Sequence, residues 1–395
     1  MLSLVTHTWD DLENEAIKKL LVQKNLTMGE KVRLFEEQFA SFVGSTYAVM
    51  VNSGSSANLL SVASLFYCNN PLKPGDEVIV PAVSWATTYS PLHQYNLKLK
   101  FVDINLDTIN IDLDKLVDAV SPATKLIVAV NVIGNPIDFD RLLNIIECKN
   151  AEFSALDESY RPMRLIEDNC ESLGASINGK QTGTFGLLGT FSTYFSHHIS
   201  TIEGGVVVTD DLELYHILLS LRSHGWTRHL PVDTKICVKN EDKFYDLFNF
   251  ILPGYNVRPT DIAGAVGIEQ LKKLPSIIEY RRNNGQLFKK LFSDIIKIQQ
   301  ETGKSSWFGF VLILPNKSLK DKLVERLNNH SIECRPVVAG NFCRNPTIKF
   351  YNYTIHDNLE NSDIIHERAI YIGNHHTDIS KELHVLRDIV VACLN

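Results

Sequence analysis

Three features are missing from the sequence, and each absence narrows what the chain can be. The seven cysteines are scattered over 395 residues without a CxxC pair, so we expect reduced thiols and a cytoplasmic location. No run approaches the ~18 uninterrupted apolar residues that a membrane-spanning helix needs. The N-terminal segment MLSLVTHTWDDLENEA lacks the basic region and apolar run of a secretory signal. We therefore expect no membrane association.

The chain also lacks a basic charge balance. Its formal net charge is −7, with 44% hydrophobic and 22% charged residues, which is ordinary for a globular protein. This balance argues against a general nucleic-acid binder, although it allows a local basic pocket. A chain of 395 residues is too long for one small core and suits a large domain with a smaller one.

Short apolar runs alternate with helical patterns from residue 48 to residue 222. Because the runs are separated by helices, the pattern predicts a mostly parallel sheet covered on both faces, and the fold class is α/β. Strands are expected at 48–51, 77–80, 99–103, 126–132, 164–168 and 206–208. Helices are expected at 10–21, 31–42, 112–120, 138–146 and 211–222.

Two segments interrupt this alternation. Residues 149–163 are polar and irregular, and they are expected to form an exposed loop. Residues 223–256 contain glycine, proline and aromatic residues without a regular pattern, and they are expected to form a long functional loop.

The C-terminal part of the chain predicts a second, smaller unit. Helices are expected at 260–271 and 274–292, divided at Pro275 because proline removes a helical hydrogen bond. Apolar runs and helices in the remainder predict an α+β domain. We therefore divide the chain into a large domain with an N-terminal helical segment, 1–274, and a small C-terminal domain, 275–395.

Residues Asn52 to Asn58 form a Ser/Gly turn between an expected strand and an expected helix. Such a turn exposes backbone N–H groups at the positive end of the helix dipole, which favours a phosphate. A tight connection without a ligand would give the same pattern. Trp85, on the loop after the next strand, could stack on a flat ring; the alternative is an aromatic side chain in the core.

Asp168 ends an expected buried strand and would therefore point into the crevice where α/β proteins bind ligands. A carboxylate in that place can keep a heterocyclic nitrogen protonated. The alternative interpretation is that Asp168 caps the helix that follows.

The stretch FSTYFSHHISTIEGG, residues 191–205, carries a histidine pair. Ser192 lies five residues before His197 and could add a second phosphate contact. A histidine pair also suggests a metal, but adjacent residues of an extended segment point in opposite directions, and no Glu-x-x-His or cysteine partner is near. We therefore expect no metal site, and we expect His198 to face away from His197 in a structural role.

The order of these pieces predicts the layout of a fold-type I pyridoxal-phosphate protein. In that layout a lysine following a strand forms a covalent bond with the cofactor aldehyde. No lysine occurs between Lys180 and Lys235, and His197 stands at the expected position. Because imidazole forms no stable bond of this kind, pyridoxal or pyridoxamine 5'-phosphate is expected to be held noncovalently.

Five motifs resemble the DegT/DnrJ/EryC1/StrS family of sugar aminotransferases over nearly the whole chain. They are SGSSAN (53–58), VPAVSW (80–85), EDNCES (167–172), HHISTIEGG (197–205) and GYNVRP (254–259). Further motifs resemble those members in which histidine replaces the family lysine. These are TWDDLE (8–13), GTFG (183–186), SHGWTR (223–228), GIEQLKKLP (267–275), SSWFGF (305–310) and ECRPVVAGNF (333–342).

The resemblance implies a role for each matching residue. His197 would be the catalytic acid and base, and Ser196 would at most orient it. Asp168 would pair with the ring nitrogen of the cofactor and act with His197 in catalysis. The other cofactor-binding candidates are Gly54, Ser55 and Ser192 for the phosphate, Trp85 for ring stacking, Glu171 near the ring hydroxyl, and Asn256 from a partner subunit. The candidates for binding substrate diphosphate or carboxylate groups are Arg222, Arg228, Arg258 and Arg335, since guanidinium groups suit both.

The resemblance also implies a reaction, in which the 3-hydroxyl of a GDP-bound 4-keto-6-deoxy sugar is removed with L-glutamate as amino donor and with release of ammonia. It implies a homodimer with shared active sites. Three alternatives remain open at this point: a nucleotide-sugar aminotransferase of the same family, a CDP-sugar 3-dehydrase, and a binding protein of the same fold without turnover. The lysine gap argues against the first, the lack of clustered cysteines against the second, and the intact catalytic residues against the third.

Overall fold

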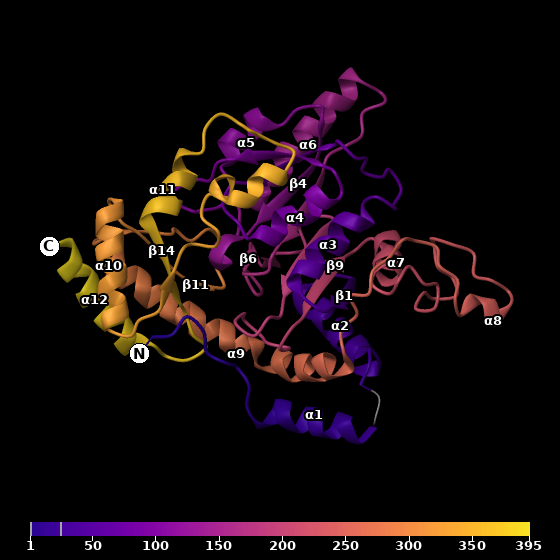
Figure 1. Ribbon diagram of the computed structural model, residues 1–395, viewed down its shortest axis with the longest axis horizontal. Helices are drawn as coiled ribbons and strands as arrows, with labels where there is room; N and C mark the ends of the chain where they lie inside the picture. The colour runs from indigo at the N-terminus through magenta and orange to yellow at the C-terminus, as the bar shows by residue number, and fades with distance from the viewer. Residues whose placement is uncertain (1, 24–25) are drawn as a thin grey trace.

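The computed structural model describes residues 2–23 and 26–395 (Figure 1). Its centre is an eight-stranded sheet with the order β1–β9–β8–β5–β4–β2–β3–β13. In that order the strands are Tyr47–Val51, Gly205–Thr209, Leu188–Ser192, Arg164–Asp168, Thr124–Val130, Glu77–Pro81, Lys98–Val102 and Tyr353–Ile355. In the described part of this sheet only β9 runs against its neighbours, so the prediction of a mostly parallel sheet is confirmed.

Successive residues of the central strands are buried in opposite layers, because side chains alternate across a strand. Val78 and Val80 of β2 enter the core on one face, while Ile79 enters the core on the other. The first face is covered by α3 (Gly54–Ser64), α4 (Ala86–Gln94) and α7 (Leu212–Leu221). The second face is covered by α2 (Glu30–Val43), α5 (Leu113–Ala119), α6 (Phe139–Leu156) and the first part of α9 (Asp261–Phe292).

The helix α2 shows how the sequence selects this packing. Val32, Phe35, Phe39 and Val43 recur at helical spacing and are all buried against the sheet. Each such side chain contributes about 1.5–3 kcal/mol by leaving water. Gly44 ends the helix with a φ of 79°, a left-handed conformation that glycine adopts without steric cost.

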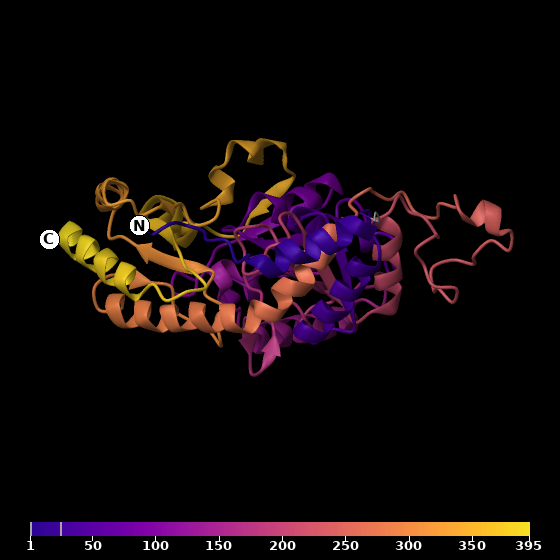
Figure 2. The same cartoon turned by 90° about the horizontal axis from the view of Figure 1, so that it is seen from below.

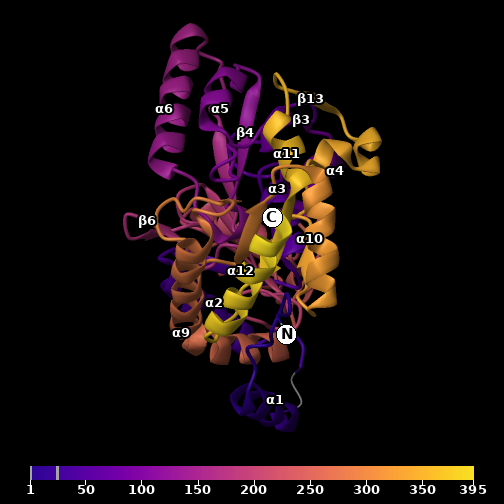
Figure 3. The same cartoon turned by 90° about the vertical axis from the view of Figure 1, so that its left-hand side faces the viewer.

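A second sheet of four antiparallel strands forms the C-terminal region. Its order is β10 (Lys297–Ile298), β11 (Gly309–Ile313), β14 (Ala369–Gly373) and β12 (Cys334–Arg335). The second part of α9, together with α10 (Lys317–Asn329) and α12 (Ser380–Leu394), packs on it (Figures 2 and 3). The other elements are α1 (Asp11–Gln23), β6 (Ser176–Ile177), β7 (Lys180–Gln181), α8 (Lys243–Asp246), α11 (Glu360–Arg368) and the 3-10 helices Val132–Gly134, Phe342–Arg344 and Pro346–Phe350.

The two regions are joined by more than the connecting helix. Strand β13, which follows residue 275 in the sequence, pairs in parallel with β3 at the edge of the large sheet. At the other end of the chain, Leu2 forms a bridge with Ile332 of the C-terminal region. Each region therefore holds a segment from the opposite end of the sequence.

Two expectations about helices are wrong. Residues 261–292 form one helix, although Pro275 lies inside it. The loss of one backbone hydrogen bond is offset because the neighbouring Leu274, Ile277 and Ile278 are buried against α2 and the sheet. Residues 149–156 are helical as well, because α6 continues to Leu156 with Phe153 buried; the irregular segment begins at Asp157.

Residues 226–250 extend away from the body of the molecule as an arm that contains the short helix α8 (Figures 1 and 2). This arm exposes a group of large apolar side chains: Val232, Val238, Phe244, Tyr245, Leu247, Phe248 and Phe250. No helix in the described residues has the length and apolar composition needed to cross a membrane.

Candidate active site

A cavity of about 590 Å³ opens where the carboxyl ends of the parallel strands meet. Segments following β1, β2, β4, β5 and β8 all contribute to its wall, so residues distant in the sequence converge there. The predicted site residues that line it are Gly54, Ser55, Trp85, Asp168, Glu171, Ser192, Ser196, His197 and Arg335.

One end of the cavity is an anion cradle at the start of α3. Ser53 caps the helix, and its Oγ accepts a hydrogen bond from Ser56 N at 3.1 Å. Gly54 and Ser55 follow, at the positive end of the helix dipole. A Cβ on Gly54 would lie 2.7 Å from Cβ of Ser192, so the two strand ends meet here only because residue 54 has no side chain. This arrangement suits a phosphate group.

Asp168, at the end of β5, is held from two sides. Its Oδ2 accepts hydrogen bonds from Asn58 Nδ2 at 2.9 Å and from Thr88 Oγ1 at 2.7 Å. Thr190 in turn donates to Asn58 Oδ1 at 2.6 Å, so the amide is itself oriented. Asp168 Oδ1 also accepts from the N–H of Cys170 at 3.2 Å, as a local cap would. The carboxylate is therefore fixed in place while still lining the cavity.

Glu171 lines the cavity beside Asp168. Its Oε2 accepts a hydrogen bond from Ile133 N at 2.8 Å, on the segment after β4. Burial, with a further contribution from the negative charge of Asp168, raises the pKa of Glu171 to about 7. This carboxyl group can therefore hold or release a proton near neutral pH.

Trp85 caps the start of α4 and has 59% of its surface exposed. Its indole lines the cavity, so the alternative of a core aromatic residue is wrong. An exposed flat side chain beside a cavity is free to stack on a ring that enters it.

His197 also lines the cavity. It belongs to a tight turn, in which its N–H donates to Tyr194 O at 2.9 Å. Its Nδ1 is 3.4 Å from Ser196 Oγ, and its ring packs against Phe308 with 5.1 Å between centroids. Burial, and then the positive charge of Arg281, lower the pKa of His197 to about 4. The imidazole is therefore neutral at physiological pH and able to accept a proton.

His198 is fully buried and does not line the cavity, although the segment is a turn and not the extended chain that the sequence predicted. Its Nε2 is 3.2 Å from Ser306 O, and burial keeps its pKa well below the usual range. His198 thus joins the histidine segment to the loop before β11.

The arginine candidates lie in different places. Arg335, on β12, lines the cavity. Arg222 is buried outside it, where its Nη1 bonds to Glu36 Oε1 and to Met50 O at 2.8 Å. Arg228 and Arg258 stack on the Trp226 ring at the base of the arm, 4.9 Å and 5.6 Å from its centroid.

Asn256 is exposed and outside the cavity of its own chain. Its Oδ1 accepts a hydrogen bond from Arg258 Nε at 3.0 Å. Asn256 thus lies with Arg228 and Arg258 on the side of the molecule from which the arm projects.

Sequence reasoning missed several residues that line the cavity or support its walls. Asn58 and Thr88 orient Asp168, Ile133 supports Glu171, and Phe308 packs on His197. Asn58 falls within the recognised SGSSAN motif, so its position could have suggested a role. Phe308 likewise falls within the motif SSWFGF (305–310). Thr88 and Ile133 have no local signal, because their contacts join segments far apart in the sequence.

The residues present fit a pyridoxal-phosphate group. The cradle suits its phosphate, Asp168 is placed for a ring nitrogen, and Trp85 offers a stacking face. In the described part of the chain, no lysine lines the cavity. These residues would therefore hold the group without a covalent bond.

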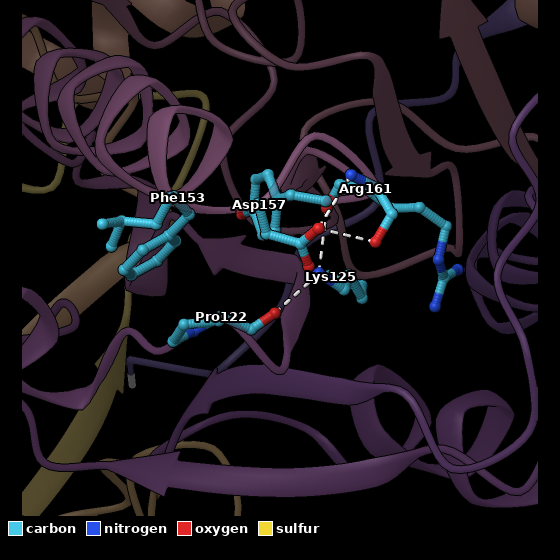
Figure 4. Close-up of a pocket in the computed structure, with 8 residues that line it drawn as sticks. Pro122, Lys125, Phe153, Asp157 and Arg161 are labelled. Atoms are coloured by element: carbon cyan, nitrogen blue, oxygen red, sulfur yellow. Dashed lines mark hydrogen bonds between the residues drawn. The ribbon is translucent and has the colours of Figure 1, made fainter.

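A second cavity of about 180 Å³ lies near the end of α6 (Figure 4). Lys125 Nζ donates to Pro122 O at 2.6 Å and to Arg161 O at 3.0 Å, and lies 4.0 Å from the centroid of the Tyr160 ring. Since the ammonium group of Lys125 already donates to two backbone carbonyls, we assign this lysine a structural role and no chemical one.

Comparison with known proteins gives consistent matches. The model of the DegT/DnrJ/EryC1/StrS aminotransferase family matches residues 8–389. The chain is 51% identical over 394 residues to GDP-4-keto-6-deoxy-D-mannose 3-dehydratase of Escherichia coli O55:H7, covering 98% of each chain.

Two solved structures of that enzyme superpose on this chain. The E. coli enzyme with bound hydrated PLP has a TM-score of 0.94 at 51% identity, with 99% of each chain covered. A mutant of GDP-4-keto-6-deoxymannose-3-dehydratase with bound GDP-perosamine also has a TM-score of 0.94 at 51% identity, covering 99% of this chain and 100% of the other.

Proposed function

Because this chain belongs to the DegT/DnrJ/EryC1/StrS aminotransferase family, we propose that it is a pyridoxal-phosphate-dependent 3-dehydratase of GDP-4-keto-6-deoxy-D-mannose. Its product would be the GDP-4-keto-3,6-dideoxy sugar, a precursor in colitose and O-antigen biosynthesis. The observation that carries the proposal is His197 in a cavity that no lysine among the described residues lines. The similar enzyme of known structure binds PLP in one crystal and GDP-perosamine in another, which supports both ligand assignments.

Pyridoxamine phosphate, when bound, supplies an amine for the 4-keto group and a ring that accepts electrons. Asp168 would keep a proton on the ring nitrogen, since Asn58 and Thr88 fix its carboxylate and its negative charge favours a cation opposite it. Gly54, Ser55 and Ser192 would bind the phosphate. Trp85 would cover the ring, and Glu171 would lie near the ring hydroxyl.

His197 would move the proton that the elimination needs. With Nδ1 beside Ser196 Oγ, Nε2 is the atom left to exchange a proton with the cavity. The neutral imidazole would first accept at Nε2 the proton lost from the amine-bearing carbon of the cofactor, and would then give it to the departing 3-hydroxyl oxygen, which leaves as water. A lysine could perform this transfer, but it would also recapture the cofactor covalently and complete a transamination.

L-glutamate would serve as amino donor, with ammonia released alongside the 3-deoxy product. Arg335 is the arginine placed to bind a carboxylate or a diphosphate within this chain's own cavity. Arg222 is the least suited of the four candidates, since its ion pair with Glu36 already occupies it.

The active enzyme would be a homodimer whose sites are shared. The arm exposes apolar side chains from Val232 to Phe250, and such a surface is typical of a protein interface. In a dimer, Asn256 could reach the cofactor phosphate of the neighbouring subunit, with Arg228 and Arg258 reaching its substrate.

Two other enzyme functions fit less well. An aminotransferase of the same family would need a lysine at the cofactor, which the cavity lacks in the described residues. A CDP-sugar 3-dehydrase would pass electrons through an iron–sulfur centre, and the seven cysteines are dispersed rather than clustered. A binding protein without turnover would not need the aligned Asp168 and His197.

Product analysis tests the proposal. The enzyme is incubated with GDP-4-keto-6-deoxy-D-mannose, L-glutamate and pyridoxal phosphate, and the nucleotide sugars are identified by mass spectrometry and NMR. The expected result is a 3-deoxy-4-keto sugar with one ammonia released per sugar. An aminated sugar as the main product would favour the aminotransferase, and no turnover would favour the binding protein.

A further inference from the structure

A buried arginine lies behind the catalytic histidine without an acidic partner. Arg281, on α9, is 4% exposed, and its Nη1 donates to Trp307 O at 3.4 Å and Phe308 O at 3.1 Å. Its Nε is buried without a hydrogen-bond acceptor. In residues 2–23 and 26–395 no carboxylate forms an ion pair with it, and its own pKa is lowered to about 10 by burial. An uncompensated buried charge is costly, so its retention calls for a reason.

The backbone that Arg281 binds is a strained corner. Trp307 has a φ of 49°, a left-handed conformation that costs energy for a residue with a large side chain. Asn374 Nδ2 donates to Trp307 O at 2.9 Å, and His198 Nε2 lies 3.2 Å from Ser306 O. With Arg281, three buried polar side chains from three segments hold this corner in one conformation.

The corner presents Phe308 to the catalytic side chain. The Phe308 ring lines the cavity and packs against His197, with 5.1 Å between centroids and 55° between planes. Arg281 is therefore one residue removed from the imidazole: its guanidinium holds the Phe308 carbonyl, and the Phe308 ring abuts His197.

The positive charge of Arg281 also acts on His197. Two other titratable groups are near the imidazole: the Tyr194 ring is 6.0 Å away, and His198 is adjacent in sequence. The titratable and charged groups that face the same cavity are Asp168, Glu171, Glu203, Arg335 and Tyr371. Apart from burial, Arg281 is the group that lowers the pKa of His197. Arg282, its neighbour on α9, is not among the causes.

We propose that Arg281 is a positioning residue for the reaction: it fixes Phe308 against His197 and places a buried positive charge near the imidazole. That charge adds to burial in keeping the imidazole neutral and ready to accept a proton. This role rests on the proposed function, since it concerns the proton transfer by His197. Arg281 does not line the cavity, so it is not one of the residues proposed to bind cofactor or substrate.

The test is an NMR titration of His197 in the cofactor-free protein, with the signal assigned by His197→Asn. In the wild type the pKa is expected well below the ordinary value of ~6.5. In Arg281→Gln it should rise by roughly 1 unit, as expected for removal of a nearby like charge, and the acid limb of the pH profile of kcat should move with it. Arg281→Lys should keep most of the depression.

Arg282→Gln is the matched control. Arg282 binds the same corner, with Nε donating to Ser305 O at 3.0 Å and Nη2 to Gly174 O at 2.8 Å. Its substitution should leave the pKa of His197 unchanged. The proposal is overturned if wild-type His197 titrates near ~6.5, or if Arg281→Gln and Arg282→Gln shift it equally. Because the titration uses no substrate, its failure is distinguishable from failure of the dehydratase assignment.

Discussion

His197 and Gly54 line the same cavity and are positioned by the fold in different ways. His197 is set by ring packing against Phe308 and by a tight turn at Tyr194. Gly54 is set by the absence of a side chain where the end of β8 passes the start of α3. In the proposed function, His197 would move the proton, and the open space beside Gly54 would admit the phosphate.

Gly54→Ala is expected to weaken cofactor binding by at least tenfold without unfolding the protein. The added Cβ would lie 2.7 Å from Cβ of Ser192 and 3.0 Å from Sγ of Cys170, so the cradle would have to open. The Kd for pyridoxal phosphate, from an absorbance titration, checks this, with a melting curve to confirm folding. Unchanged affinity would mean that the phosphate is bound elsewhere.

The sequence was sufficient to locate the chemical residues but not their supports. Asp168 and Ser192 end the strands β5 and β8, as the apolar runs before them predict, and His197 follows β8 in a turn. Phe308 lies in the motif SSWFGF and Arg281 in no motif, but both are more than eighty residues beyond His197, so their proximity to it could not be predicted from the sequence. The same limit applied to Arg222, whose partner Glu36 comes from α2.

The irregular segment after helix α6 is held in place by one long-range ion pair, between Arg161 and Asp76. Arg161 bonds through Nη1 to Asp76 Oδ2 at 2.9 Å and through Nη2 to Asp76 Oδ1 at 2.6 Å. Its Nη1 also donates to Pro71 O at 2.9 Å. The two-bond geometry and partial burial make this pair stronger than an exposed one.

Arg161→Ala is expected to lower the free energy of unfolding by about 1–2 kcal/mol, because it leaves Asp76 partly unpaired. Glu152→Ala is the control, since its ion pair with Lys149 on the same helix is more exposed and should contribute less than ~0.5 kcal/mol. Urea unfolding followed by circular dichroism measures both. Equal effects of the two substitutions would contradict the role assigned to Arg161.

The arm between residues 226 and 250 exposes large apolar side chains that nothing in the described part of a single chain covers. Phe244 and Phe248 are 74% and 66% exposed on it, a state that is unfavourable in water unless another surface covers them. We expect Phe244→Asp with Phe248→Asp to convert a dimer to a monomer and to abolish turnover. Light scattering after gel filtration checks the mass; a monomeric wild type, or an active monomeric variant, would contradict the shared site.

The molecule as a whole combines a sheet that the sequence predicted with connections that it did not. The alternation of apolar runs and helices was enough for a mostly parallel α/β sheet. Strand β13 was not foreseen, because three residues that pair with a strand over 250 positions earlier carry no distinctive pattern. The helix break predicted at Pro275 is also absent, since the burial of α9 outweighs the local cost of the proline.

Buried histidines should make the folded protein sensitive to mild acid. Burial lowers the pKa of seven fully or partly buried histidines, at positions 197, 198, 216, 229, 366, 375 and 376. At pH 7 they are neutral in the folded protein and mostly neutral in the unfolded chain, whose histidines have the ordinary pKa of ~6.5. As the pH falls through ~6.5 the unfolded chain binds protons before the folded one, so the free energy of unfolding decreases.

Two buried carboxyl groups act in the opposite direction. The pKa values of Glu167 and Glu171 are raised to about 7, so between pH 7 and about 4.5 these groups favour the folded state as the pH falls. Because seven histidines oppose two carboxyl groups, the Tm of the cofactor-free protein is expected to fall between pH 7 and pH 5. Scanning calorimetry at both values decides this, and a constant or rising Tm would contradict it.

In the proposed site a histidine, His197, takes the place of the lysine that would bind the cofactor covalently. Intact-mass spectrometry after borohydride reduction of the loaded enzyme tests this replacement, with His197→Lys as the matched variant. Wild type is expected to keep its unmodified mass, while His197→Lys is expected to gain the mass of one reduced cofactor. A wild-type chain that gains the cofactor on any lysine would contradict it.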